Sequence, residues 1–403
     1  MKQANILTGK TEIQNVSSLA FKLLLIIFWM RNTGVNFLLY FYKRVPIIGM
    51  TGDVILPVVV VSLILLALPY MLKHIKWQDI LFYLVCMATV LISMLLWWKN
   101  VEYIEKHLWQ MLGLTFPLYF LGICYDHEDT KKLLYICSLI GVAVMFVYQL
   151  REVNTGEELA EDNMFAAYNC LPSVLFLING AFERKKILPW LAAVAGIVLS
   201  FVFGTRGPIL AILLFILIRI VGNILHSKSA AAKVITTVVC GFVAYYLLAT
   251  DVITQWSIVL SELFEEIGFS NRVFEFYLEG EIAESEGREL KAAIISQAIS
   301  GNLFTGLGIM GDRVLLGGAY VHNIALEIWC NFGVVFGTLA LGGIILAPLS
   351  AVWNNRNREN RYFVIMLATM VFTKLMLSNS YLIEPYLFFM LGVAVHEIRS
   401  KRA

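Results

Sequence analysis

The amino-acid sequence predicts an all-α integral membrane protein with about twelve transmembrane helices and one large extracytoplasmic loop that contains short amphipathic helices. Hydrophobic residues make up 59% of the chain and charged residues 15%, whereas a soluble domain is about half apolar and about a quarter charged. Apolar runs of about 17–25 residues recur along the sequence, and each is long enough to cross a bilayer. Residues 251–321 lack such a run. Residues 1–403 are therefore expected to form a single polytopic membrane domain, with 251–321 as its large loop.

The apolar runs define twelve candidate spans. They cover residues 18–42, 53–72, 79–98, 104–124, 131–150, 163–182, 187–204, 207–226, 232–250, 322–353, 361–379 and 382–397. The first run follows a polar stretch and lacks a small-residue cleavage site, so we expect a retained helix rather than a signal peptide. Arg31 lies in the middle of that run with no evident partner.

Lysine and arginine residues predict the orientation. If the N-terminus is cytoplasmic, the cytoplasmic segments carry seventeen Lys and Arg residues and the opposite short loops carry six. Cytoplasmic loops are enriched in these residues, so both termini are expected in the cytoplasm. Residues 151–162, the Thr205–Gly207 turn, the 251–321 loop and the turn near Asn379 would then lie outside. A site built there has no access to ATP or nucleotide sugars.

Composition and motifs exclude several classes of protein. A net charge of +2 without a long Lys/Arg block predicts no nucleic-acid partner. No phosphate-binding glycine loop, zinc-protease motif or serine-hydrolase motif occurs in a usable context, and no DxD pair occurs, so no metal or other cofactor is expected. The scattered cysteines are expected to be small buried hydrophobes. They are Cys86, Cys124, Cys137, Cys170, Cys240 and Cys330.

The predicted outer loop has structure of its own. Acidic residues outnumber basic ones in it by eleven to four. The segment 289–299 places Leu290, Ala293, Ile294, Gln297 and Ala298 at helical spacing, which predicts an amphipathic helix on the membrane surface. The glycine-rich segment 301–308 predicts a turn after it.

Arg206 lies in Gly204-Thr205-Arg206-Gly207-Pro208, at the predicted outer junction of two spans. A charge near a helix end can simply snorkel to the headgroups. The flanking glycines and the proline also favour a gap, in which an anionic headgroup would meet both the guanidinium and a helix N-terminus.

Two further residues of the outer face are candidates for chemistry. Arg288 begins the amphipathic helix, where it either pairs with neighbouring glutamates or offers a second guanidinium, a group that binds phosphate through two parallel hydrogen bonds. His322 lies where the loop enters the next span. A lone histidine is more often structural, but here it could also accept a proton from a sugar hydroxyl near neutral pH.

Glu327 and Glu384 lie in predicted spans, where a carboxylate is costly unless it is paired or functional. Lys374 is the natural partner of either one, so a structural ion pair is the favoured interpretation and substrate binding is the alternative. Arg219 lies near the cytoplasmic end of its helix and is expected to snorkel.

Three motifs in this order resemble the O-antigen ligase and O-antigen polymerase superfamily, the Wzy/WaaL type of membrane glycosyltransferase. The first is Thr205-Arg206-Gly207. The second is Gly287-Arg288, followed by Asn302-Leu303-Phe304-Thr305-Gly306-Leu307-Gly308. The third is His322-Asn323-Ile324-Ala325-Leu326-Glu327, followed by Phe332-Gly333-Val334-Val335-Phe336-Gly337.

The resemblance implies a GT-C type fold in the bacterial inner membrane and a donor glycan linked through diphosphate to undecaprenol. It implies that Arg206 and Arg288 hold the diphosphate and stabilise its charge as it leaves. His322 would orient or deprotonate the acceptor hydroxyl for a metal-independent, inverting attack. Asn323, Glu327 and Glu384 are added as substrate-binding candidates. The expected partners are the lipid bilayer and, in the same pathway, a flippase and a chain-length regulator.

Three functions remain open from the sequence. The leading one is a polymerase that joins lipid-linked repeat units into O-antigen or capsular polysaccharide. A ligase that moves finished glycan to a lipid core or a wall polymer would use the same donor chemistry, but the short loops offer no evident dock for a second large acceptor. A transporter or flippase of lipid-linked oligosaccharide predicts broken or charged helices near the midplane and an internal repeat, and no such repeat is evident.

Overall fold

The structure is a computed structural model that describes residues 14–30, 46–155, 160–184, 187–203, 205–226, 252–267, 286–355 and 357–400, together with residues 234, 238, 274, 275 and 278. Among these described residues, all the regular elements are helices. The chain divides into two compact units, which are described separately. Unit 1 comprises residues 1–137 and 287–403, and unit 2 comprises residues 138–286.

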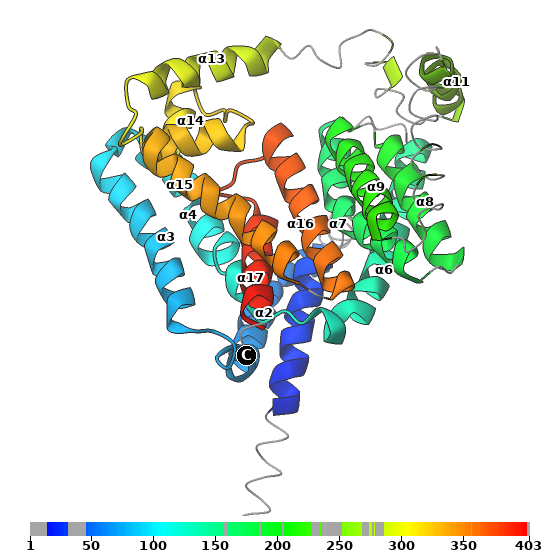
Figure 1. Ribbon diagram of the computed structural model, residues 1–403, viewed down its shortest axis with the longest axis horizontal. Helices are drawn as coiled ribbons and strands as arrows, with labels where there is room; N and C mark the ends of the chain where they lie inside the picture. The colour runs from blue at the N-terminus through cyan, green and yellow to red at the C-terminus, as the bar shows by residue number, and fades with distance from the viewer. Residues whose placement is uncertain are drawn as a thin grey trace, which may run out of the picture. The chain divides into compact units, whose positions relative to one another are not determined.

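Unit 1 combines helices from both ends of the chain (Figure 1). In order, they are the helix Gln14–Met30, α2 (Pro46–Met71), α3 (Trp77–Leu96), η1 (Trp98–Asn100), α4 (Val101–Trp109), the π-helix η2 (Gln110–Thr115), α5 (Leu118–Ile123), the start of α6 (His127–Thr155), α13 (Glu286–Ser300), α14 (Gly311–Leu315), α15 (Ile324–Asn354), α16 (Arg358–Leu377) and α17 (Pro385–Ser400). Helices α13 and α14 lie at the end of this unit opposite the C-terminal end of α17 (Figure 1).

Five described helices are long and apolar enough to cross a membrane. They are α3, α6 over His127–Val147, α9 (Arg206–His226) over Arg206–Leu225, α15 and α16. Nine of the twelve predicted spans each coincide with one described helix, a tenth, 104–124, is divided among α4, η2 and α5, and the structure supports a multi-pass helical membrane protein. Of the other two spans, 18–42 is helical as far as Met30, and 232–250 is described only at Val234 and Val238, which are helical. Arg31 and Cys240 lie outside the described residues.

The predicted loops are corrected at one place and confirmed at another. The loop predicted at 151–162 is shorter, because α6 continues to Thr155 and α7 begins at Ala160. Nothing between Arg151 and Thr155 is a proline or glycine, so the helix does not end where its apolar run ends. The 251–321 loop contains α11 (Val252–Ile267), α13 and α14, which confirms that it carries short helices. Four cysteines are buried and free as predicted, and Cys86 is half-buried and free.

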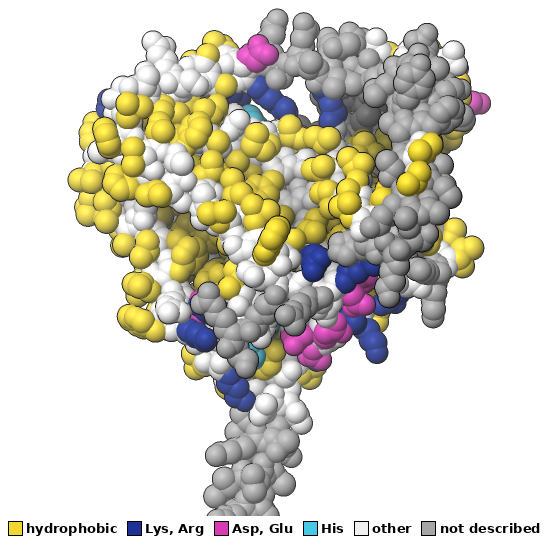
Figure 2. All heavy atoms as spheres, in the orientation of Figure 1, with side chains coloured by type: hydrophobic (Ala, Val, Ile, Leu, Met, Phe, Trp, Pro, Cys, Tyr) yellow, Lys and Arg dark blue, Asp and Glu magenta, His cyan; other side chains and the backbone are white. Residues whose placement is uncertain are grey.

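Helices α3 and α15 present apolar side chains outward. Leu95 on α3 is 82% exposed and Leu339 on α15 is 70% exposed, and hydrophobic side chains cover this face of unit 1 (Figure 2). Trp77 and Trp98 stand at the two ends of α3 and are also largely exposed. Because tryptophan favours the headgroup level of a bilayer, its place at both ends of α3 fits one complete membrane crossing.

The interior of unit 1 is organised around α17, which packs against α5 at backbone distance. A Cβ atom at Gly122 would lie 2.2 Å from the Phe389 carbonyl oxygen, and one at Gly392 would lie 2.1 Å from the Tyr119 carbonyl oxygen. Small residues allow helices to approach this closely, which favours dispersion contacts in a membrane protein. The turn before α17 contributes to the site described below.

Unit 2 contains the rest of α6 with α7 (Ala160–Arg184), α8 (Ile187–Val202), α9 and α11. Helices α8 and α9 pack against α7. Arg219 on α9 is only 2% exposed, and its guanidinium carbon lies 5.1 Å from the centre of the Phe182 ring on α7. The prediction that Arg219 snorkels is therefore wrong, because an aromatic face inside the unit takes up the cation.

Candidate functional site

The 302–308 turn packs on a break in α15. Gly333 interrupts the helix with φ 75° and ψ 170°. The N–H groups of Leu307 and Gly308 donate to the carbonyls of Cys330 and Asn331 at 2.7 and 3.1 Å, and Val334 N donates to the Leu303 carbonyl at 2.7 Å. The turn therefore satisfies peptide groups that the break removes from the helix.

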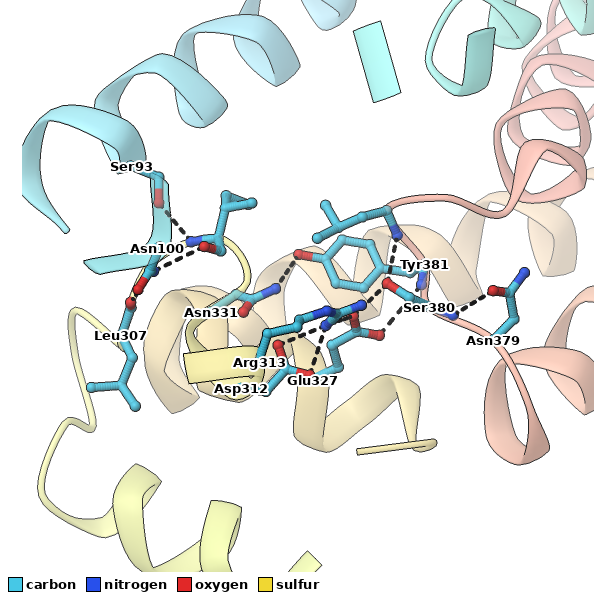
Figure 3. Close-up of polar contacts among 12 residues, drawn as sticks. Ser93, Asn100, Leu307, Asp312, Arg313, Glu327, Asn331, Asn379, Ser380 and Tyr381 are labelled. Atoms are coloured by element: carbon cyan, nitrogen blue, oxygen red, sulfur yellow. Dashed lines mark hydrogen bonds and ion pairs between the residues drawn. The ribbon is translucent and has the colours of Figure 1, made fainter. Parts of the chain in front are cut away.

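Glycine is required on both sides of this contact. A Cβ atom at Gly306 would lie 2.4 Å from Gly333 N, and one at Gly333 would lie 2.6 Å from the Leu303 carbonyl oxygen. Both glycines also have positive φ. On the other side of the turn, the Asn100 side-chain amide donates to the Leu307 carbonyl at 2.8 Å (Figure 3). The predicted glycine-rich turn is thus confirmed, and it joins η1 to α15.

Helix α14 carries a buried arginine between two carboxylates (Figure 3). Arg313 Nη1 donates to Asp312 Oδ1 at 2.6 Å, to Asp312 Oδ2 at 2.7 Å and to Glu327 Oε1 at 2.6 Å. All three residues are buried. A buried charge costs several kcal/mol unless it is paired with good geometry. These three side chains therefore form a tightly paired group, named here the Arg313 cluster.

The Arg313 cluster also binds the turn between α16 and α17. Ser380 Oγ donates to Glu327 Oε1 at 2.5 Å, and Tyr381 N donates to Glu327 Oε2 at 3.3 Å. On the next turn of α15, Asn331 Nδ2 donates to the Tyr381 hydroxyl at 2.8 Å (Figure 3). Helices α14 and α15 are thereby fixed to the turn between α16 and α17, which lies more than fifty residues further along the chain.

The second predicted carboxylate, Glu384, is fully buried beside the same turn. Its Oε2 lies 2.8 Å from Lys374 Nζ and accepts from Asn379 Nδ2 at 2.5 Å. The predicted ion pair with Lys374 is therefore confirmed for Glu384, whereas Glu327 pairs with Arg313. Substrate binding by Glu327 or Glu384 stays a prediction.

His322 lies between α14 and α15 in an unusual conformation. Its φ of 55° falls in the left-handed region, which costs a non-glycine residue free energy. The imidazole contacts the Tyr320 ring, with 4.2 Å between centroids. Its Nδ1 is buried and has no hydrogen-bond partner among the described residues. Strain and an unsatisfied polar atom at one residue are typical of functional positions.

Tyr320 connects His322 to the Arg313 cluster. The Tyr320 hydroxyl donates to the Ser378 carbonyl at 2.5 Å, and the Arg313 guanidinium carbon lies 5.3 Å from the centre of the Tyr320 ring. The His322 imidazole therefore packs against a Tyr320 ring that is fixed by a hydrogen bond at its hydroxyl and by the Arg313 guanidinium over its face. The cluster thereby supports His322 through the Tyr320 ring.

Helix α13 brings two cations towards His322. Ile295 and Ile299 face inward and form a hydrophobic cluster with Val321 and Cys330. Arg288 and Lys291 precede them at helical spacing on the same face. Arg288 is exposed and Lys291 is half-buried. Basic side chains are seen beside a histidine at the end of the molecule where α13 lies (Figure 2).

These surroundings weaken the affinity of His322 for a proton. Partial burial, and then the positive charges of Lys291, Arg288 and Arg313, lower the pKa of His322 to about 4. The imidazole is therefore neutral at pH 7 and can accept a proton. The same positive charges favour an anion beside it.

The neighbouring Asn323 is the N-cap of α15. Its Oδ1 accepts from Ala325 N at 3.0 Å and from Leu326 N at 3.2 Å. A capping side chain of this kind fixes the point at which a helix begins. Asn323 therefore sets the position of His322, and its predicted contact with substrate remains a prediction.

Arg206 belongs to unit 2, where it is the first residue of α9, one residue before the predicted start of that span. A Cβ atom at Gly207 would lie 1.9 Å from the Tyr168 hydroxyl oxygen, so a side chain at this position would displace the Tyr168 ring of α7. The Thr205 hydroxyl is buried and has no hydrogen-bond partner among the described residues. Arg206 itself is exposed, next to the N–H groups of a helix N-terminus. This end of α9 suits an anion.

The structure brings Arg288 and His322 together and adds residues that the sequence analysis did not single out. Lys291 lies one helical turn after Arg288, and this spacing was a signal that could have identified it. Asp312 and Arg313 were harder to find, because their importance depends on burial against Glu327. Comparison of the chain with known protein families, with characterised proteins and with solved structures gives no match.

Proposed function

We propose that the chain is a membrane glycosyltransferase that joins undecaprenyl-diphosphate-linked repeat units into an O-antigen or capsular polysaccharide. The observation that carries the proposal is the placement of Arg288 and Lys291 beside the strained His322 imidazole, whose Nδ1 has no partner among the described residues. Cations next to a proton acceptor suit a reaction in which a diphosphate leaves while a hydroxyl loses its proton. The motif order supports the same chemistry through the resemblance to the polymerase superfamily.

Each residue has a distinct role in this reaction. The acceptor hydroxyl oxygen attacks the anomeric carbon of the donor glycan, and the bond from that carbon to the diphosphate oxygen breaks. His322 accepts the hydroxyl proton, and undecaprenyl diphosphate leaves with the bonding electron pair. Arg288 and Lys291 bind the diphosphate and stabilise its developing charge. Arg206 keeps the role that the resemblance implies, as a second guanidinium for the donor.

Donor binding would strengthen the base. Burial is the largest cause of the low pKa of His322, and two of the positive charges that add to it, Lys291 and Arg288, are the groups proposed to hold the diphosphate. A bound anion offsets these charges and moves the pKa back towards its ordinary value near 6.5. Proton transfer is therefore favoured only when the donor is in place.

In this proposal the chain has twelve spans, both termini are cytoplasmic, and the 251–321 loop lies outside. The location of α13 and α14 at the end of unit 1 opposite the C-terminal end of α17 supports it (Figure 1). The break in α15 at Gly333 is also a feature of transporters. Here, however, peptide groups at the break bind the 302–308 turn, so they are not available to coordinate a transported ion.

Reconstituted protein tests the proposal directly. Purified protein in liposomes is supplied with undecaprenyl-diphosphate oligosaccharide, and the products are separated by chain length while released lipid diphosphate is measured. Longer chains and an equal amount of released lipid diphosphate are expected. Donor that only changes leaflet at constant length would support a transporter and contradict the proposal. Glycan that moves only to an added lipid-core acceptor would support a ligase.

A pair of matched variants tests the site assignment. His322→Gln should lose most of the activity. His107→Gln should keep it, because His107 lies on α4, whereas the cations of the candidate site, Arg288 and Lys291, lie on α13. Arg288→Ala should raise the donor KM and lower kcat, and it is compared with Lys99→Ala, another exposed cation. Full activity in both His322→Gln and Arg288→Ala would refute the assignment.

A further inference from the structure

The turn on the break in α15 exposes two large hydrophobic side chains. Leu303 is 49% exposed and Phe304 is 65% exposed. The Leu303 carbonyl accepts from both Val334 N and Val335 N, so the turn is fixed to the start of the second half of α15. Val335 and Phe336 on that helix are also exposed, at 45% and 60%. The exposed side chains of the turn and the helix therefore form one continuous apolar surface.

The length of the second half of α15 shows where this surface lies in a bilayer. From Val334 to Trp353 the helix is about 20 residues long, which is about 30 Å and equals the thickness of the hydrocarbon core. Trp353 is 90% exposed, and an exposed tryptophan fits the headgroup level at that end. The Leu303–Phe304 turn then lies at the opposite boundary of the hydrocarbon core.

Helix α13, which precedes the turn, shows the same preference. Its inner face packs through Ile295 and Ile299, whereas Leu290 and Ile294 on another face are exposed at 63% and 37%. These two belong to the face that the sequence predicts to contact a membrane surface. Leu290 is the more exposed of the two, and Arg288 and Lys291 lie on the same helix. An apolar face bordered by cations suits the headgroup region.

We propose that Leu303 and Phe304 form a membrane anchor, which inserts into the acyl region of one leaflet at the break in α15 and holds α13 at headgroup level. The occupant of this surface is the lipid of the bilayer. The proposal does not depend on the glycosyltransferase function, because it rests on exposure and on the hydrogen bonds of the turn. It explains why a turn that carries Phe304 outward is fixed so firmly to a spanning helix.

Site-directed spin labelling in liposomes tests the anchor. Nitroxide labels are placed at Phe304→Cys, at Glu289→Cys as an aqueous control on exposed α13, and at Leu339→Cys as a lipid control on exposed α15. Unmodified protein, treated with the same reagent, measures labelling of the native cysteines. Collision with oxygen reports lipid, and collision with a water-soluble nickel complex reports water.

The label at Phe304 should behave like the label at Leu339, with oxygen collisions exceeding nickel collisions, and its depth should be about 5–10 Å inside the headgroup boundary. The label at Glu289 should show the reverse. Nickel access at Phe304 equal to that at Glu289 would overturn the proposal. Protection of Phe304 from both reagents would overturn it as well, because that result indicates contact with a second protein chain.

Discussion

The two charged regions of unit 1 use similar side chains in opposite ways. In the Arg313 cluster, every charged side chain is buried and paired at 2.6–2.7 Å. Beside His322, the cations of α13 are exposed or half-buried, and the imidazole Nδ1 has no partner among the described residues. Closely paired buried charges are expected in a structural region, whereas a strained and unsatisfied polar group is expected at a functional one. We therefore assign the Arg313 cluster to the scaffold and His322 to the candidate site. Charge alone would not have distinguished the two regions.

The largest expected effect comes from breaking the scaffold. Arg313→Met leaves the Asp312 and Glu327 carboxylates buried without their cation, and this should lower the free energy of unfolding by about 3–5 kcal/mol. Thermal unfolding in detergent micelles measures it. Lys106→Met is the control, because Lys106 and Glu102 form an exposed i,i+4 pair, and solvent screening makes such a pair contribute little to stability. Equal losses in the two variants would show that the cluster is not a scaffold.

A substitution of His322 should lower activity without lowering stability, the reverse of the result expected for Arg313. His322→Gly deletes the proton acceptor and relieves the positive φ, so we expect turnover to fall by about 100-fold or more while the free energy of unfolding stays constant or rises by about 1 kcal/mol. Chain elongation and thermal unfolding are measured on the same preparations. A large loss of stability without loss of turnover would reassign His322 to the scaffold.

The stability of the folded protein should depend on pH through His322. The pKa of His322 in the folded protein, about 4, is below its ordinary value of 6.5, so the unfolded chain takes up the proton first as the pH falls. This contribution to stability is intact above pH 6.5 and is lost as the pH falls towards 4. The melting temperature of the wild type should therefore fall more steeply than that of His322→Gln in this window.

Kinetics at the same pH values test the effect of the donor. For the free protein, kcat/KM should keep its value down to about pH 5, whereas kcat should decline at a higher pH, because the bound diphosphate raises the pKa of His322. Identical pH profiles for kcat/KM and kcat would contradict the proposed contact between the donor and the cations of α13.

Much of the fold could be predicted because apolar runs and turn residues act locally. The run at 79–98 became α3, and the glycines at 306 and 308 became a turn with positive φ. Helix ends were less predictable where the apolar run stopped without a breaker, as in α6. The break in α15 at Gly333 gave no local signal, since glycine is common in membrane helices and this one matters only because the 302–308 turn packs on it.

Several residues of the candidate site could be predicted from the sequence, but which of them form the scaffold and which are available for chemistry could not. Position along the chain identified Arg288 and His322. It also identified Glu327 and Glu384, with Lys374 as the expected partner of either one, and Lys374 pairs with Glu384. The partner of Glu327, Arg313, lies in a loop that the sequence presents as solvated and acidic. Only packing excludes water from it, and periodicity within one segment carries no information about that packing.

The smallest expected effect belongs to Lys291, and it tests how far the site extends along α13. Lys291→Ala removes one half-buried cation from the group around His322. We expect the donor KM to rise about fivefold, a loss of about 1 kcal/mol, with little change in stability. The kcat/KM profile should also shift to higher pH, since the pKa of His322 rises when the positive charge is removed. Lys99→Ala should change neither quantity. A larger KM without a shifted profile would place Lys291 on the donor but too far from the imidazole to tune it.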